Sequence, residues 1–155
     1  MSVEEYKEYT KVEIQLNNAE RKAFKPLEIL EYKEELLISD KEYIEEKITN
    51  INASLDNKIS TFENEILIYK SNSILYKKQG DNDKAESELN KISKTESRIQ
   101  KSKDKTSIKL EKLNSKLKDI SSNLDNIVNK EIPAQKKLSE EEFTLKKKEI
   151  EKKSI

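Results

Sequence analysis

The side chains best suited to chemistry form a basic run in the second half of the chain. Residues 98–118 carry seven lysines and one arginine against only Asp104 and Glu111. Cations in a row can neutralise backbone phosphates, so this run suggests a nucleic-acid-associated function. It contains no aromatic residue to stack on bases, which argues against that function. The candidate phosphate contacts are Arg98, Lys101, Lys105, Lys109, Lys112 and Lys116.

Clustered glutamates are a second group of chemically capable side chains. Glu34-Glu35, Glu45-Glu46 and residues 140–142 could in principle serve as catalytic carboxylates or cation ligands. Such roles require a pocket that desolvates the carboxylate and shifts its pKa, and a pair of long helices offers none. We therefore interpret these residues as solvated helix faces.

The residue types that are absent exclude much enzymology. The chain has no cysteine and no histidine, so thiol nucleophiles, imidazole acid–base catalysis and zinc sites built on these ligands are ruled out. Its single glycine, Gly80, cannot form a phosphate-binding or dinucleotide-binding loop. We predict no catalytic, cofactor-binding or metal-binding residues and a protein that is not an enzyme.

Hydropathy bears on location. The longest apolar run is the four residues 66–69, far short of the roughly 20 needed for a membrane span. The N-terminus is acidic where a signal peptide would be basic and then apolar. We expect no membrane span and no signal peptide, with the protein in the cytoplasm or inside a macromolecular particle.

The composition favours long helices over a globular core. Only 33% of the 155 residues are hydrophobic, whereas 40% are charged. Apolar residues nevertheless recur every 3.5 positions over residues 85–127, the period of a coiled coil. Three polar residues interrupt this stripe and predict a weaker middle: Glu96, Lys103 and Thr106. The predicted stripe is Ala85, Leu89, Ile92, Glu96, Ile99, Lys103, Thr106, Leu110, Leu113, Leu117, Ile120, Leu124 and Ile127.

A matching stripe precedes this one across a predicted turn at residues 79–83. From Leu27 to Tyr76 the apolar spacing is again three and four, with one additional step of four near residues 55–59 that indicates a stutter. Folding about Gly80 pairs residues whose numbers sum to about 161. The fold class predicted is all-α: a long antiparallel coiled-coil helical hairpin with short additional N- and C-terminal helices.

Capping and proline signals set the expected boundaries. We predict an N-terminal helix over residues 2–25, with a break or a kink near Pro26. The first hairpin arm spans 26–78, with a break near residue 39 left open, and the second spans 84–131. Pro133 should end that arm, and a C-terminal helix follows over 134–153. Together these elements form one elongated unit covering residues 1–155.

Charge is distributed unevenly along the chain. Residues 1–50 carry 8 Lys/Arg and 13 Asp/Glu, a net charge of −5, whereas residues 101–155 carry 15 and 10, a net charge of +5. Opposite charges on the two arms favour antiparallel pairing within one chain. A continuous helix through Gly80 that pairs with another copy remains the alternative.

The sequence thus favours a non-enzymatic structural or adaptor protein that serves as a rod, tether or scaffold in a larger multiprotein assembly such as a virion or secretion apparatus. Protein partners or self-association are expected, and the terminal helices supply candidate partner-binding residues Tyr6, Tyr9, Phe143 and Leu145. The alternatives are phosphate binding through the 98–118 face and inhibition of one partner through its groove.

Overall fold

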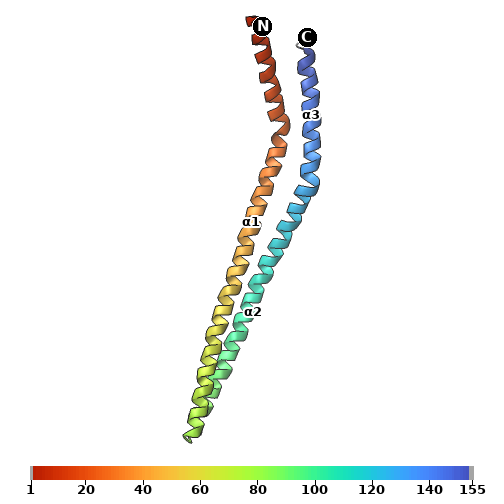
Figure 1. Ribbon diagram of the computed structural model, residues 1–155. Coiled ribbons are helices and arrows are strands. Elements are labelled where there is room, and N and C mark those ends of the chain that lie inside the picture. The colour runs from red at the N-terminus through yellow and green to blue at the C-terminus, as the bar shows by residue number, and fades with distance from the viewer. Residues whose placement is uncertain (1, 154–155) are drawn as a thin grey trace. The chain divides into compact units, whose positions relative to one another are not determined.

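The computed structural model describes residues 2–153, and every regular element in that range is a helix (Figure 1). Two long α-helices, α1 (Val3–Lys78) and α2 (Asn82–Asn126), are followed by a π-helical segment, η1 (Ile127–Glu131), and by α3 (Ile132–Lys153). The all-α class predicted from the sequence is confirmed.

The chain divides into two compact units. Unit 1 comprises residues 1–41 together with 119–155, and unit 2 comprises residues 42–118. Each unit therefore contains one segment of α1 and one segment from the second half of the chain.

The first helix begins with a reciprocal cap. The Ser2 N–H donates to Glu5 Oε2, and the Glu5 N–H donates to Ser2 Oγ, both at 3.1 Å. This is the capping box that the spacing of the two residues predicts, and it satisfies a backbone donor that has no partner within the helix.

The sequence predicts a break or a kink near Pro26, and α1 runs through Pro26 and through Ser39 without interruption, so the helix breaks at neither residue. A proline removes one backbone hydrogen bond and crowds the preceding turn, at about 3 kcal/mol. Packing on both sides offsets this: Ala23 and Leu27 are buried, and Phe24 contacts Phe143 edge to face with ring centroids 6.4 Å apart. The helix changes direction in this region rather than ending (Figure 1).

The predicted stop at Pro133 is wrong, since α3 follows η1 without a gap. In η1 the Ile132 N–H donates to the Ile127 carbonyl, five residues back instead of four. Pro133 has no N–H, and the wider π turn gives its ring room that a regular α turn lacks. The capping pattern at Ser139 starts no helix either, because this residue is buried within α3 and its Oγ accepts a hydrogen bond from Gln135 Nε2 at 3.2 Å.

Three residues separate α1 from α2, and their backbone forms a Schellman turn. The Asp81 N–H donates to the Tyr76 carbonyl at 2.9 Å and the Gly80 N–H to the Lys77 carbonyl at 3.1 Å. Gly80 has a φ of 80°, the left-handed conformation that this motif requires. Asp81 then caps α2, because its Oδ1 accepts the Lys84 N–H at 3.1 Å.

In unit 2 the segments of α1 and α2 lie side by side, with a stripe of buried and half-buried residues between them that we call the seam (Figure 1). On α1 it contains every apolar residue predicted there, and Ser73 in addition. Two successive steps of four, from Ile51 to Leu55 to Ile59, form the predicted stutter. The α1 part of the seam is Ile44, Ile48, Ile51, Leu55, Ile59, Phe62, Ile66, Tyr69, Ser73 and Tyr76.

The α2 part of the seam is Ala85, Glu88, Ile92, Thr95, Ile99, Ser102, Thr106, Leu110, Leu113 and Leu117. The prediction of Leu89, Glu96 and Lys103 at this contact is wrong. Leu89 is 46% exposed, whereas Glu88 is only 6% exposed. The observed phase leaves Glu96 and Lys103 in water and buries one charge instead of two, which lowers the desolvation penalty.

The core of unit 1 is smaller. Its buried side chains are Ala23, Leu27, Ile127 and Ser139, supplemented by the contact between Phe24 and Phe143. At the N-terminal end Thr10 is half-buried.

Substituting Gly80 by alanine tests the turn. An ideal Cβ at Gly80 meets no atom within 4 Å, so only the left-handed backbone opposes a side chain. We expect Gly80→Ala to lower the free energy of unfolding by about 1 kcal/mol, and Gly80→Asn by less, because asparagine tolerates this conformation better. Thermal unfolding followed by circular dichroism measures both. Equal stability of wild type and Gly80→Ala would contradict the assigned turn.

Candidate functional site

A row of cations borders the seam on one side of unit 2. Of the ten α2 residues that directly precede a seam residue, nine are basic and the tenth is Ser87. We call these nine residues the basic edge. They follow the seam through its change of spacing, so they stay on one side of α2 along the whole unit. The basic edge consists of Lys84, Lys91, Lys94, Arg98, Lys101, Lys105, Lys109, Lys112 and Lys116.

The opposite side of α2 has a different character. The ten residues that directly follow a seam residue include two lysines, Lys103 and Lys118, and three glutamates. The positive charge of residues 84–118 is therefore concentrated on one side. Simple solvation of the helix requires no such segregation, because an exposed face of mixed charge is equally soluble.

A groove lies beside the basic edge at the level of the stutter. It has a volume of about 230 Å³. Lys58 from α1 and Lys101, Lys105 and Lys109 from α2 line it, and no acidic residue does. Ser54, Ser102 and Thr106 add hydroxyl groups to the wall. Four ammonium groups with hydroxyl donors between them form a site suited to phosphate oxygens.

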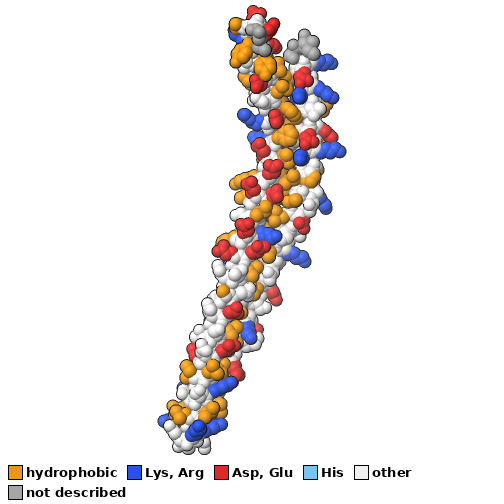
Figure 2. Space-filling view, viewed as in Figure 1, with side chains coloured by type: hydrophobic (Ala, Val, Ile, Leu, Met, Phe, Trp, Pro, Cys, Tyr) orange, Lys and Arg blue, Asp and Glu red, His pale blue; other side chains and the backbone are white. Residues whose placement is uncertain are grey.

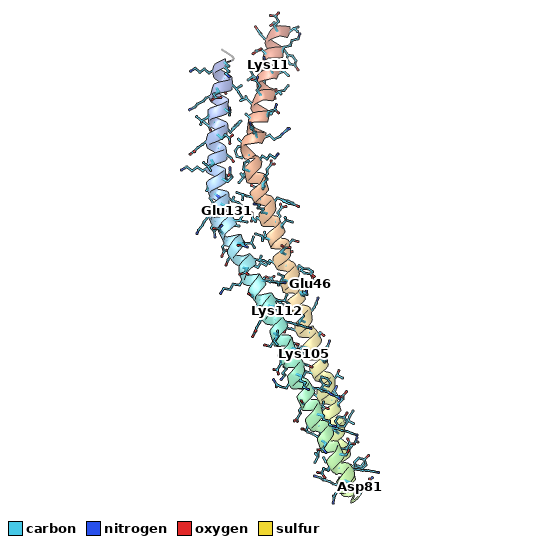
Figure 3. All side chains as sticks on the ribbon, turned by 180° about the vertical axis from the view of Figure 1, so that it is seen from behind. Lys11, Glu46, Asp81, Lys105, Lys112 and Glu131 are labelled. Atoms are coloured by element: carbon cyan, nitrogen blue, oxygen red, sulfur yellow. The ribbon has the colours of Figure 1, made fainter. Side chains whose placement is uncertain are left out.

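The lysines of this groove form no ion pair in the part of the chain that the structure describes. Ion pairs in residues 2–153 involve the basic edge only at Lys84, with Asp81, and at Lys91, with Glu88. Lys101, Lys105 and Lys109 are four residues apart and exposed, so they repel one another along the helix. Figure 3 shows Lys105 and Lys112 on α2.

All six basic residues singled out from the sequence lie on the basic edge, and Lys103 and Lys118 of the same run do not. Four further lysines were not predicted from the sequence: Lys58, Lys84, Lys91 and Lys94. Lys58 lies level with residue 103 in the register in which paired residue numbers sum to about 161. The sequence therefore already indicated that Lys58 lies beside the basic run of residues 98–118.

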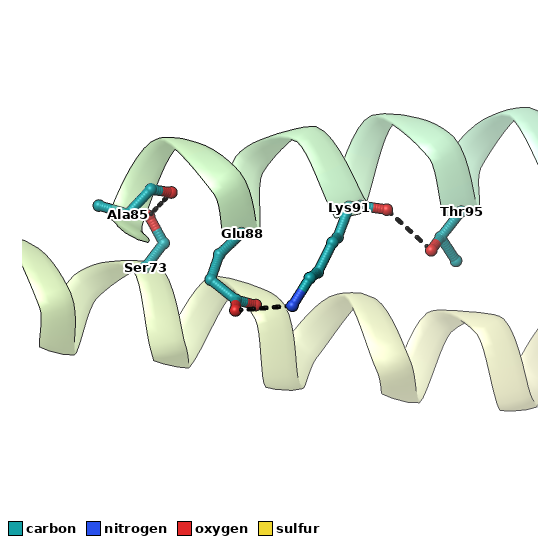
Figure 4. A network of polar contacts seen from close by, with 5 residues as sticks. All are labelled: Ser73, Ala85, Glu88, Lys91 and Thr95. Carbon is teal, nitrogen blue, oxygen red and sulfur yellow. Dashed lines mark hydrogen bonds and ion pairs between the residues drawn. The ribbon is translucent and has the colours of Figure 1, made fainter. Parts of the chain in front are cut away.

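Near the turn the seam is polar (Figure 4). Ser73 Oγ donates to the Ala85 carbonyl at 3.3 Å, which links the two helices, and Thr95 Oγ donates to the Lys91 carbonyl at 2.9 Å. The buried Glu88 accepts a hydrogen bond from Lys91 Nζ at 3.1 Å through Oε1, while its Oε2 has no partner among the described residues. A buried carboxylate that is only partly satisfied stabilises little and favours one register over others.

The contact with Glu88 changes the pKa of Lys91. Its hydrogen bond to Glu88 and the negative charge of that carboxylate raise the pKa of Lys91 above the ordinary value of 10.5, against an opposing effect of desolvation. The ammonium also lies 5.7 Å from the ring centroid of Tyr69, and Lys84 lies equally far from Tyr76. Both cations of the basic edge nearest the turn are thus engaged within the unit.

The predicted partner-binding residues belong to unit 1 and differ in exposure. Tyr6, Tyr9 and Leu145 are exposed. Phe143 is half-buried against Phe24, so it contributes to the packing of unit 1.

Residues 2–153 contain no group of three or more acidic side chains placed to hold a metal ion. None of the helices in that range has a stretch long and apolar enough to cross a membrane. Comparison with models of protein families, with curated proteins and with solved structures finds no match to this chain.

Reversing one charge in the groove tests whether the lysines repel one another. Lys105→Glu gives two opposite-charge pairs, with Lys101 and Lys109, and should raise the free energy of unfolding by about 1 kcal/mol at low salt. High salt should screen most of this gain. Lys103→Glu is the matched control, because no basic residue lies three or four positions away. Equal effects of both substitutions in urea unfolding would rule out the proposed repulsion.

Proposed function

We propose that the protein is a non-enzymatic structural or adaptor protein, an antiparallel coiled-coil hairpin that acts as a rod, tether or scaffold component in a larger multiprotein assembly. What supports this is the seam of unit 2, in which ten residues of α1 and ten of α2 follow the same three-and-four spacing. The stutter of one helix matches that of the other: the steps of four from Ile51 to Ile59 correspond to those from Ser102 to Leu110. Paired stripes of this kind form an extended support and leave little interior for a substrate.

Small buried cores also favour a role within an assembly. Of the residues that the structure describes, only eleven are buried, and four of these are polar. An isolated helical pair with so little apolar burial gains stability from neighbouring molecules.

The assembly role predicts that the seam is required and that the outer surface of unit 2 is not. Leu113→Glu places a charge in the seam and should remove most helicity and assembly, because a buried unpaired charge destabilises by several kcal/mol. Ile108→Glu is the control, since Ile108 lies on the same helix and is exposed. Gradient sedimentation of the tagged chains from the native source measures the size of the particle. Wild-type chain that sediments only as free monomer or dimer would refute the role.

The basic edge favours a second candidate function, sequence-independent binding to the phosphate backbone of a nucleic acid. The groove brings Lys58 beside Lys101, Lys105 and Lys109 without an acidic neighbour in its lining. The chain has zero net charge, but nine of the eleven basic residues of α2 lie on one side of that helix, and this creates a local attraction for phosphates.

A quadruple substitution tests this second function. Changing Lys58, Lys101, Lys105 and Lys109 to glutamine should abolish most binding to a single-stranded oligonucleotide and lower the slope of log K against log salt by about 0.7 per lost phosphate contact. The matched control changes Lys70, Lys77, Lys103 and Lys118, which follow seam residues on the opposite side. Fluorescence anisotropy at low salt measures both. Absent wild-type binding, or an equal loss in both variants, would dispose of the function.

A further inference from the structure

Unit 1 carries a second apolar stripe that its own helices leave uncovered. Ile29, Leu36 and Leu138 each precede a buried or half-buried residue, and Leu145 lies one heptad beyond Leu138. The exposed fractions of these four side chains lie between 46% and 63%. Ile29 and Leu36 are also one heptad apart, so each pair lies on one side of its helix. We call this stripe the apolar face.

Two adjoining depressions follow the apolar face between the helices of unit 1. One, of about 400 Å³, is lined by Pro26, Ile29, Ala134 and Leu138 among others. The next, of about 460 Å³, includes Leu36, and both include Glu131. Together they form one groove along residues 26–40 of α1, roughly 20 Å at the rise of an α-helix. In Figure 2 apolar side chains reach the surface of unit 1 among charged ones.

The number of apolar positions per heptad indicates how many helices meet. A helix with one partner needs two apolar positions in seven, whereas a helix in a four-helix bundle needs a third. Unit 1 supplies a third apolar position at Ile29, Leu36 and Leu138, which directly precede the buried or half-buried Leu30, Leu37 and Ser139. The equivalent positions of α2 in unit 2 are the nine basic residues of the basic edge and Ser87, which would not pack against more helices.

The charges beside the groove are complementary to those of a second copy of the same chain. Lys22 and Lys33 lie on the α1 side, and Glu131 and Glu142 lie on the opposite side, with no ion pair to one another among the described residues. In a dimer with a twofold axis parallel to the helices, the α1 side of the groove in one copy faces the opposite side of the groove, which carries Glu131 and Glu142, in the second copy. Lys33 then faces Glu131 of the second copy, and Lys22 faces Glu142 of the second copy.

We propose that the apolar face of unit 1 pairs with the same face of a second copy to form a four-helix bundle. Helices of this length offer on the order of 800 Å² per copy, the area of a standard stable interface. The zero net charge of the chain means that two copies have no net repulsion to overcome. The inference rests on the proposed structural role and names one partner for it.

Light scattering after size-exclusion chromatography tests the pairing. Wild type should run as a dimer at about 100 µM, and Ile29→Glu with Leu138→Glu should run as a monomer, with Kd raised at least roughly a hundredfold. The control, Leu67→Glu with Ile74→Glu, makes the same change at exposed positions one heptad apart in unit 2 and should stay dimeric. Monomeric wild type, a dimer that survives the first variant, or dissociation of the control would overturn the proposal.

Mixing two charge variants tests the direction of pairing. Lys33→Glu and Glu131→Lys should each weaken the homodimer, because like charges then face each other across the interface. Their mixture restores both opposite-charge contacts, so heterodimer should exceed statistical mixing by about threefold or more. Native mass spectrometry counts the species. Purely statistical mixing would contradict the twofold arrangement, whereas an intact native assembly without any dimer would refute this inference and leave the structural role standing.

Discussion

Two helices in contact can remove from water only the residues that face each other, about two positions in every seven. This constraint governs the whole chain, because only 33% of its residues are hydrophobic and its helices have few other elements to pack against. Every change in spacing on one helix must be matched on the other. The steps of four around Leu55 and around Thr106 meet this requirement, and the groove lined by four lysines lies where they meet.

Apolar periodicity predicted the all-α class and the α1 part of the seam except Ser73, since apolar residues occupy the other nine positions. It failed on α2 between Ala85 and Thr106, where each heptad offered either of two neighbouring residues. Leu89 is the more hydrophobic choice, but it belongs to the phase that also buries Glu96 and Lys103. Desolvating two charged side chains costs more free energy than burying one leucine gains. Apolar periodicity considers only the apolar residues, so it does not include this cost.

Proline and glycine signals were decisive only where packing did not oppose them. Gly80 ends α1 because its left-handed φ costs nothing for glycine and the turn is exposed. Pro26 and Pro133 do not end their helices, since buried neighbours and a π turn accommodate them. The part of the candidate site that lies on α2 was predictable from the sequence, because its residues belong to a single helix. Lys58 comes from the other helix and required the register between the two.

In the proposed hairpin α2 returns along α1 within one chain. Spin labels at Thr49 and Asn114, both exposed and introduced as cysteines into a chain that has none, measure this directly when labelled protein is diluted into unlabelled protein. Adjacent helices predict a label separation of about 10–25 Å, given axes roughly 10 Å apart. A single helix continuing through Gly80 would separate the labels by on the order of 100 Å, and that result would contradict the account.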